Sequence, residues 1–268
     1  MKKIFLSCDI EGTAGICAWD ETEWGDPRNE YFRAQMSREA SSACLGALDA
    51  GADEIFVKDA HDSARNLDPK LLPKEAKLLR GWAGNMLSMM AGIDSMPFDA
   101  AMMTGYHACA GNDGNPLSHT MSSGRIDHVT INGIQASEFI INAYTAAYFG
   151  VPTCFVSGDA ALCRSAKKFI PAITTVETNE GIGSAVVSIH PDLACERVRE
   201  GVKTALSGDL SLCMPEKPEI YKIEIGYRKH QEAHAKSFYP GAVAKGSCAL
   251  TFEHTDYLEC LRLFHFVL

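Results

Sequence analysis

The amino-acid sequence predicts an α/β protein with three layers (α/β/α), in which helices cover both faces of a mostly parallel sheet, followed by a smaller α+β unit. Short apolar runs typical of buried strands alternate with helical patterns over most of the chain, and this alternation favours βαβ units. The composition changes at Met214-Pro215-Glu216-Lys217-Pro218, where two prolines and flanking charges resemble a linker. We therefore expect a larger unit at residues 1–213 and a smaller unit at residues 214–268.

The first elements of the larger unit follow one another closely. The apolar run from Lys3 to Cys8 predicts a strand. Apolar residues at helical spacing over residues 29–50, with Gly51 as a stop, predict an amphipathic helix. We then expect strands at residues 54–58, 77–79 and 100–104, with a short helix near residues 85–91.

A polar segment rich in Gly, Asn and Pro at residues 108–118 predicts a loop long enough to close over a site. Beyond it we expect a strand at residues 127–131, a tight turn at Asn132-Gly133, a helix from Ser137 to Gly150, a strand at residues 153–157 and a helix at residues 160–168. The smaller unit should contain strands at residues 220–225, 242–244 and 248–252, and a closing helix from about Asp256.

Composition and charge exclude several classes of protein. With 268 residues, of which 46% are hydrophobic and 22% charged, the chain can bury a large core without staples. A net charge of -9 argues against a nucleic-acid partner. No stretch approaches the ~20 apolar residues of a membrane span, and the apolar run after Lys2-Lys3 is too short for a signal peptide. We expect a soluble, cytoplasmic protein with no membrane partner, whose ten cysteines are free thiols.

Acidic residues and histidines follow three of the predicted strands. Asp9 and Glu11 come after the first strand, His61 after the second, and His107 after the strand at residues 100–104. The carboxyl ends of parallel strands meet at one edge of the sheet, and zinc prefers carboxylate and imidazole ligands. If the first strand continues through Asp9 and Glu11, both side chains point the same way. Alone, each residue has an ordinary structural role, but the combination predicts a metal site.

Two further carboxylates have simpler explanations. Asp59 precedes His61 by two residues and is expected to orient its imidazole. Glu138 lies in the first turn of a predicted helix, where the positive helix terminus is sufficient to explain a carboxylate. The segment His230-Gln231-Glu232-Ala233-His234 lacks a glutamate directly after its first histidine, as the zinc-protease helix requires, and predicts a solvated helix face.

The sequence resembles the zinc D-aminopeptidases of the DppA type. The matching segments occur in family order over roughly residues 1–180: Ser7 to Gly12, Lys58 to His61, Gly105 to Ala108, Leu117 to Met121, Glu138 with Asn142 to Tyr144, and Val156 to Asp159. The resemblance implies two zinc ions per chain that share Asp9, with Glu11, His61, His107 and Glu138 as the other ligands and His119 as the catalytic residue. Three carboxylate charges would then face the four positive charges of two zinc ions.

The resemblance implies an activity and an assembly. It implies an aminopeptidase that releases N-terminal residues, D-amino acids such as D-alanine, from short peptides, and a homodecameric ring with sites facing an inner channel. Manganese or cobalt could replace zinc, because the same ligands accept all three metals. His119 is a nucleophile in the family proposal, but proton transfer to the leaving amine suits a histidine near neutral pH better.

Two alternatives stay open at this point. The first is another di-metal hydrolase, such as an amidase or a phosphoesterase, since such sites also serve phosphoryl chemistry. A phosphoesterase usually has Arg or Lys near the metals to hold phosphate, and Lys58 and Arg125 are the only nearby candidates in sequence. The second is a non-catalytic peptide-binding protein that keeps the same fold, although such a module has no need of the full set of ligands and His119.

Overall fold

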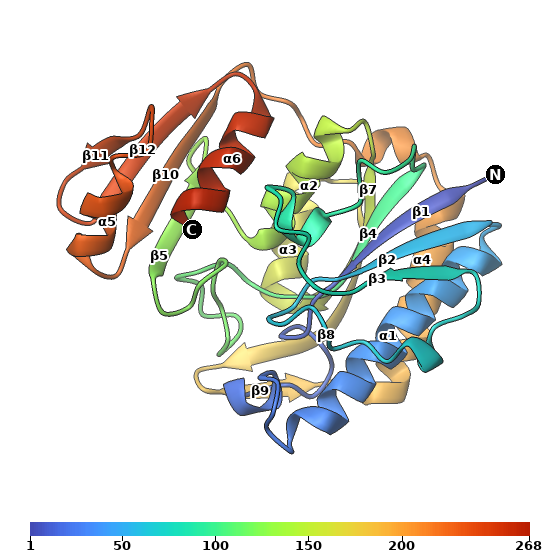
Figure 1. The fold of residues 1–268 in the computed structure, drawn as a ribbon. Helices are drawn as coiled ribbons and strands as arrows, with labels where there is room; N and C mark the ends of the chain where they lie inside the picture. Colours follow the sequence, from blue (N-terminus) through green and yellow to red (C-terminus); the bar gives the residue numbers. More distant parts are fainter.

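Seven strands form the main sheet of the computed structural model, which describes all 268 residues (Figure 1). Their order is β3-β2-β1-β4-β7-β8-β9, and every neighbouring pair is parallel except β8 and β9. The strands are β1 (Lys3–Cys8), β2 (Glu54–Asp59), β3 (Ala76–Leu79), β4 (Ala100–Tyr106), β7 (Thr153–Asp159), β8 (Thr174–Ile182) and β9 (Ala185–Ser188). The predicted, mostly parallel sheet is confirmed.

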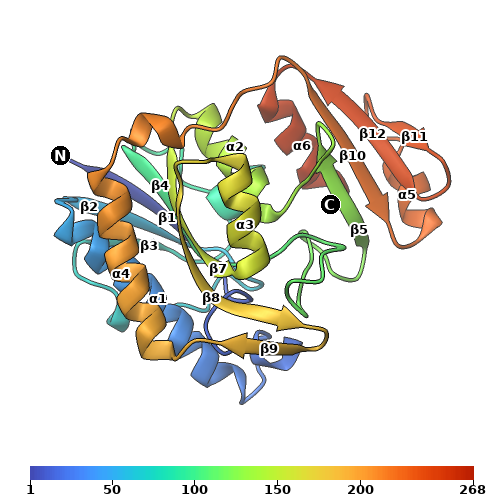
Figure 2. The ribbon, with the colours of Figure 1, turned by 180° about the vertical axis from the view of Figure 1, so that it is seen from behind.

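Four helices cover the main sheet. They are α1 (Asn29–Asp49), α2 (Glu138–Tyr148), α3 (Ala160–Phe169) and α4 (Pro191–Ser207). The chain moves along the sheet in one direction from β1 to β2 and in the other from β4 through β7 to β8. Because such crossovers are right-handed, their helices lie on opposite faces. Helices α1 and α4 pack against each other, as Figure 2 shows, and α2 contacts α3, which completes the three layers.

A second sheet of five antiparallel strands forms the smaller unit, in the order β11-β12-β10-β5-β6. Its elements are β5 (Ile126–Ile131), β6 (Ile134–Gln135), β10 (Tyr221–Tyr227), β11 (Val243–Lys245) and β12 (Ala249–His254), with helices α5 (His230–Lys236) and α6 (Tyr257–Val267). Figure 1 shows β5, in green, beside the orange β10. Residues 126–135 therefore add two strands to a sheet whose other strands follow the linker at residue 214, although the composition change gives no sign of this.

Several short elements depart from the sequence expectations. Four 3₁₀ turns occur: η1 (Trp19–Glu21), η2 (Pro69–Leu71), η3 (Ser88–Met90) and η4 (Leu210–Cys213). The helix expected near residues 85–91 is wrong, because only η3 forms there and Ser88 has a left-handed φ of +49° that interrupts a helix. The strands β8 and β9 and the helix α4 were not predicted.

The turn that follows β1 packs closely against the end of β4. The Asp9 N–H donates to Thr104 O at 2.9 Å, and the Gly12 N–H donates to Gly105 O at 2.8 Å. Gly105 has a φ of +70°, and a Cβ there would lie 2.1 Å from Asp9 O. A side chain at either glycine is excluded, since a Cβ on Gly12 would lie 1.8 Å from Tyr106 O.

The structure also describes the state of the cysteines and the character of the helices. All ten cysteines are free. None of the helices combines the length and the apolar character that crossing a membrane requires.

Candidate metal centre

The five residues predicted to bind metal meet at the carboxyl ends of three neighbouring strands. Asp9 and Glu11 follow β1, His61 follows β2, and His107 follows β4, while Glu138 lies in the first turn of α2. All five side chains are buried. The chain reverses its direction along the sheet between β1 and β4, and open α/β sheets place their ligands at the carboxyl ends of the strands at such a position.

The local structure around Asp9 and Glu11 differs from the sequence expectation. Strand β1 ends at Cys8, so the two residues occupy the turn that follows and not a continued strand. Their carboxylates converge because this turn is fixed against β4, and the Ile10 N–H donates to Asp9 Oδ1 at 2.9 Å. The two carboxylates converge as predicted, but the turn after β1 brings them together, not the alternation of side chains along a strand.

Two groups of possible metal ligands share Asp9. In the first group, His61 Nδ1 lies 3.3 Å from Asp9 Oδ1 and 3.2 Å from Glu11 Oε1. In the second, His107 Nε2 lies 3.6 Å from Asp9 Oδ2 and 3.5 Å from Glu138 Oε2. Each group brings three ligand atoms close enough together to hold one ion. The two oxygens of Asp9 thus face two adjacent sites.

These separations fit a metal ion better than hydrogen bonds. Two ligands at the usual zinc distances and a tetrahedral angle are about 3.3 Å apart, close to the observed distances. Three buried atoms in these groups have no hydrogen-bond partner: Asp9 Oδ2, Glu11 Oε2 and His107 Nε2. Buried polar atoms are rarely left unpaired, so the residues present fit a bound cation.

Backbone carbonyls set the tautomers of both histidines. His61 Nε2 lies 3.1 Å from Thr22 O, and His107 Nδ1 lies 2.9 Å from Ala108 O. Because a carbonyl only accepts, each of these nitrogens carries a proton, and in the neutral imidazoles the lone pairs are those of His61 Nδ1 and His107 Nε2. This is the arrangement that orients a histidine toward a metal.

The buried carboxylates of the site need positive charge near them. Burial raises the pKa of Asp9 well above its usual range, and the charge of Glu11 raises it further. Burial lowers the pKa of His61, but the Glu11 and Asp9 carboxylates outweigh it and raise that pKa overall. Burial also opposes ionisation of Glu138, yet His107 holds its pKa at about 2. Either protons or bound cations must balance these carboxylates.

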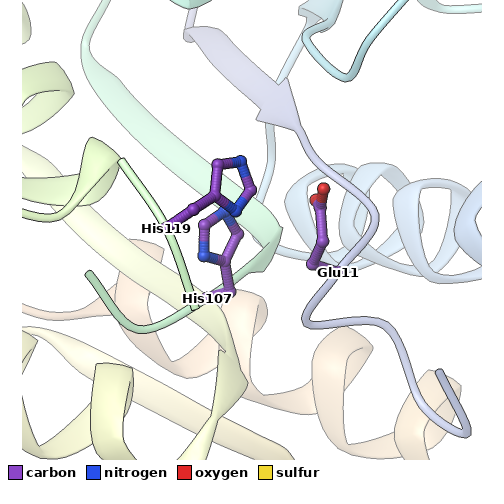
Figure 3. A group of neighbouring side chains, drawn as sticks. All are labelled: Glu11, His107 and His119. Atoms are coloured by element: carbon purple, nitrogen blue, oxygen red, sulfur yellow. The ribbon is translucent and has the colours of Figure 1, made fainter. Parts of the chain in front are cut away.

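His119 lies on the loop between β4 and β5 and stacks on His107 (Figure 3). The two ring centroids are 4.2 Å apart with an interplanar angle of 13°. His119 Nδ1 lies 2.8 Å from Leu117 O, and Nε2 lies 3.6 Å from Glu138 Oε1. Next to it, Thr120 Oγ1 donates to Ala136 O at 3.0 Å, so the loop is fastened beside His119.

Two aspartates near the site, Asp59 and Asp159, have roles that the sequence interpretation does not give them. Asp59 does not orient the His61 imidazole, because its carboxylate accepts from the N–H groups of Asn66 and Leu67 and from the Asn66 side chain. Asp159 caps α3 and also accepts from the Ala108 N–H at 2.7 Å. Its position just before a helix was the available signal for the capping role.

A second set of contacts fixes the other oxygen of Glu138. The Met121 N–H donates to Glu138 Oε1 at 2.7 Å, and Ser137 caps the same helix as predicted. Met121 has a φ of +62°, which is strained for a residue with a side chain. This conformation directs the N–H at a carboxylate whose Oε2 is left facing His107.

An open cavity of about 590 Å³ leads to these residues. Its wall includes three of the carboxylates, His61 and His119, and the side chains of Trp19, Trp82, Met89 and Met121. No lysine or arginine lines it. Lys58 is buried against the backbone carbonyls of Asp59 and Gly81, and Arg125 pairs with Glu232. The cavity is therefore acidic, with several apolar side chains in its wall and room for a small peptide.

Comparison with known proteins agrees with this site. A family model described as D-aminopeptidase matches residues 1–266. The D-aminopeptidase of Bacillus subtilis (strain 168) is 31% identical over 262 residues, which cover 97% of this chain and 94% of the relative. The structure of the Zn-dependent D-aminopeptidase DppA from Bacillus subtilis, described as a self-compartmentalizing protease, has a TM-score of 0.89 at 30% identity and covers 98% of this chain and 95% of that chain. Similarity over nearly the whole length means that the chain belongs to the D-aminopeptidase family.

Proposed function

We propose that the protein is a zinc-dependent aminopeptidase that releases N-terminal residues, D-amino acids such as D-alanine, from short peptides. The observation that carries this proposal is the Asp9 carboxylate, which gives one oxygen to each of two buried ligand groups. Asp9, Glu11, His61, His107 and Glu138 would hold two zinc ions. Zinc bound there would polarise the scissile carbonyl and lower the pKa of a water molecule.

The remaining residues have roles that follow from their contacts. His119 Nδ1 donates its proton to Leu117 O, so Nε2 is the nitrogen free to exchange a proton. Nε2 faces Glu138 Oε1, whose position the Met121 N–H fixes. We assign to His119 Nε2 the transfer of a proton to the leaving amine, which suits an imidazole near neutral pH. Trp19 and Trp82 form part of the cavity wall.

The rival functions have less support. A phosphoesterase usually holds its phosphate with Lys or Arg side chains in addition to its metals, and no lysine or arginine lines the cavity. A non-catalytic peptide-binding protein would not need His119 beside two ligand groups. An amidase would use the same residues, and the choice between peptide and simple amide depends on substrate tests.

Parallel assays of D-Ala-D-Ala and L-Ala-L-Ala test the proposal. Free alanine would be measured with zinc-loaded protein and again after chelation, and zinc would be counted in the same samples. We expect chelator-sensitive cleavage of the D-peptide and two zinc ions per chain. Cleavage of the L-peptide alone would retain the metallopeptidase and discard the preference for D-residues. Cleavage of neither peptide by zinc-loaded protein would contradict the aminopeptidase.

We also propose a homo-oligomer, a decameric ring in the cytoplasm with short peptides as substrates. The relative described as a self-compartmentalizing protease supports an assembly, because it resembles this chain over 98% of its length. Manganese or cobalt would substitute for zinc at a site built from nitrogen and oxygen ligands.

A further inference from the structure

His119 has a second aromatic neighbour besides His107. The Trp19 ring centroid lies 5.3 Å from that of His119, with an interplanar angle of 64°, which is an edge-to-face contact. His107 covers one face of the imidazole, and Figure 3 shows these two rings one above the other. Trp19 and His119 also line the same cavity. The imidazole therefore contacts both a buried proposed ligand and an indole at the cavity wall.

The segment that carries Trp19 is firmly fixed. The Glu21 carboxylate accepts from the N–H groups of Cys17 and Ala18 at 2.7 and 3.0 Å. Thr22 Oγ1 donates to Trp19 O at 2.9 Å, and the Asn29 side chain donates to Glu21 O at 3.0 Å. Trp19 is thus presented by a turn closed at both ends, and its ring does not depend on a flexible loop.

The same segment reaches the other ligand group. Thr22 O accepts from His61 Nε2 at 3.1 Å and orients that imidazole. Trp19, three residues earlier, contacts His119 beside the second group. Residues 17–22 therefore contact His61 in the first ligand group and His119 beside the second.

His119 needs such support because its own contacts leave it free to swing. Its single hydrogen bond is to Leu117 O, two residues away on the same loop, and its Nε2 is 3.6 Å from Glu138 Oε1, beyond hydrogen-bond distance. Trp19 is the aromatic side chain in contact with His119 that also lines the cavity. A shift of about 1 Å in a catalytic group can cost about 100-fold in rate.

We propose that Trp19 is a positioning residue, which holds His119 against His107 so that Nε2 stays directed at the reacting atoms. This inference rests on the proposed function, since it takes His119 as the proton-transfer residue. It adds a residue from outside the set of ligands and explains why an indole that is 36% exposed stands at the cavity wall.

Kinetics of Trp19→Ala and Trp19→Phe test the proposal in zinc-loaded, full-length protein with D-Ala-D-Ala. We expect Trp19→Ala to lower kcat about 10- to 100-fold with KM and zinc content unchanged, and Trp19→Phe to restore most of the rate. The matched control is Trp24→Ala, since Trp24 is 48% exposed, lies against Arg33 and does not line the cavity. A rise in KM alone, a loss of zinc or an unchanged kcat would each overturn the proposal.

A measurement without substrate tests the contact itself. In a Trp24→Phe, Trp82→Phe background, Trp19 is the only tryptophan, because the chain has three. We expect His119→Ala to change the emission intensity of Trp19 and to make it more accessible to acrylamide. Unchanged fluorescence would overturn the positioning role even if the protein cleaved neither peptide, an outcome that would separately contradict the proposed function.

Discussion

At the residue scale, Asp9 is the side chain on which both ligand groups depend. Its Oδ1 faces His61 and its Oδ2 faces His107. Glu11→Ala would leave Asp9, His107 and Glu138 together, whereas Asp9→Ala removes a donor from both groups. We expect Asp9→Ala to lose both zinc ions and Glu11→Ala to lose one, as measured by elemental analysis after gel filtration.

The control for these variants is Glu23→Gln. Glu23 lines the same cavity but belongs to neither ligand group, so its zinc content should match that of the wild type. One full equivalent of zinc retained by Asp9→Ala would show that the carboxylate does not bridge two ions.

His119 should affect the rate and not the metal content. His119 forms a third group of neighbouring ligand atoms with Glu11 and His107, but it belongs to neither of the two groups that share Asp9, and its Nε2 faces Glu138 at 3.6 Å. We expect His119→Ala to lower kcat about 10²- to 10⁴-fold, the usual contribution of general acid–base catalysis, with zinc content unchanged. Stopped assays with D-Ala-D-Ala and metal analysis of one preparation measure both quantities. A near-normal rate with an unchanged pH profile would exclude both an acid–base and a nucleophilic role.

The sequence predicted side chains at the site better than it predicted their supports. The residues that follow strand ends could be found because parallel strands bring their carboxyl ends to one edge. The groups that orient the histidines are the carbonyls of Thr22 and Ala108. Every residue has a carbonyl, so no side-chain pattern marks these two. Asp59 was misassigned because its carboxylate turns to Asn66, seven residues further along the chain.

At the scale of elements, Gly105 in β4 allows the turn after β1 to pack closely against β4. This packing sets the distance between Asp9 and His107. A Cβ at this position would overlap Asp9 O, and the φ of +70° is unfavourable for any other residue. We expect Gly105→Ala to lower the free energy of unfolding by more than the ~1–2 kcal/mol of the backbone conformation alone, and to weaken zinc binding. Denaturant unfolding and zinc titration measure these effects.

The variant Gly183→Ala separates the cost of the backbone conformation from the cost of the overlap between a Cβ and a neighbouring atom. Gly183 has a φ of +60° in the turn between β8 and β9, with no atom near the position of a Cβ. Its replacement should therefore lower the free energy of unfolding only by the cost of the backbone conformation, and it should leave zinc binding intact. Equal losses of stability in the two variants would argue against the close packing of β1 and β4.

Helix α1 contains a buried carboxyl that makes stability depend on pH. Glu39 accepts from the Ala14 N–H and the Gln35 side chain, and burial raises its pKa from 4.5 to about 7. The folded state therefore holds this proton more tightly than the unfolded state. Below pH 4.5 Glu39 has no effect, stability falls as the pH rises from 4.5 to 7, and the full cost is present above pH 7.

Glu39→Gln should remove this cost, because the amide is neutral at every pH and keeps an oxygen for Ala14. We expect the variant to be more stable than the wild type at pH 8, by up to about 3 kcal/mol, and equally stable at pH 4.5. Urea unfolding at several pH values gives the difference. Glu196→Gln, on the exposed side of α4, is the control. A difference that does not change with pH would contradict the assignment.

The elements that were missed show where sequence patterns are weak. Helix α4 has Pro191 in its first turn and buried apolar residues at Ala194, Val198 and Val202, a signal that was available but not used. Strand β8 is harder to recognise, since Thr, Glu and Asn alternate with few apolar residues along it. The pairing of β5 with β10 joins residues about one hundred positions apart, and no local pattern specifies such a partner.

At the scale of the whole molecule, the two sheets are connected through the helices between them. Helix α2 carries Glu138 at its N-terminus and contacts α6 of the smaller unit. The Tyr257 hydroxyl donates to Ile141 O at 2.8 Å across this contact. The smaller unit therefore supports the helix that supplies a proposed zinc ligand, which gives it a role beyond completing the core.

The surface of the smaller unit bears on the proposed assembly. Phe238, Val243 and Phe266 are 75%, 63% and 58% exposed. Tyr239, next to Phe238, has its ring 6.2 Å from that of Phe266, so the two phenylalanines belong to neighbouring parts of the surface. Large apolar side chains gathered on one surface mark protein–protein contacts.

We therefore expect the double variant Phe238→Glu, Phe266→Glu to dissociate the homo-oligomer, because each substitution would place a charge in a contact that excludes water. Sedimentation velocity at equal protein concentration measures the change in mass, and zinc content should stay constant, since neither residue belongs to a ligand group. Leu71→Glu is the matched control, with an apolar side chain 41% exposed in η2 of the larger unit. An unchanged mass in the double variant would move the interface elsewhere. A dissociated protein that begins to cleave long peptides would link the assembly to the selection of short ones.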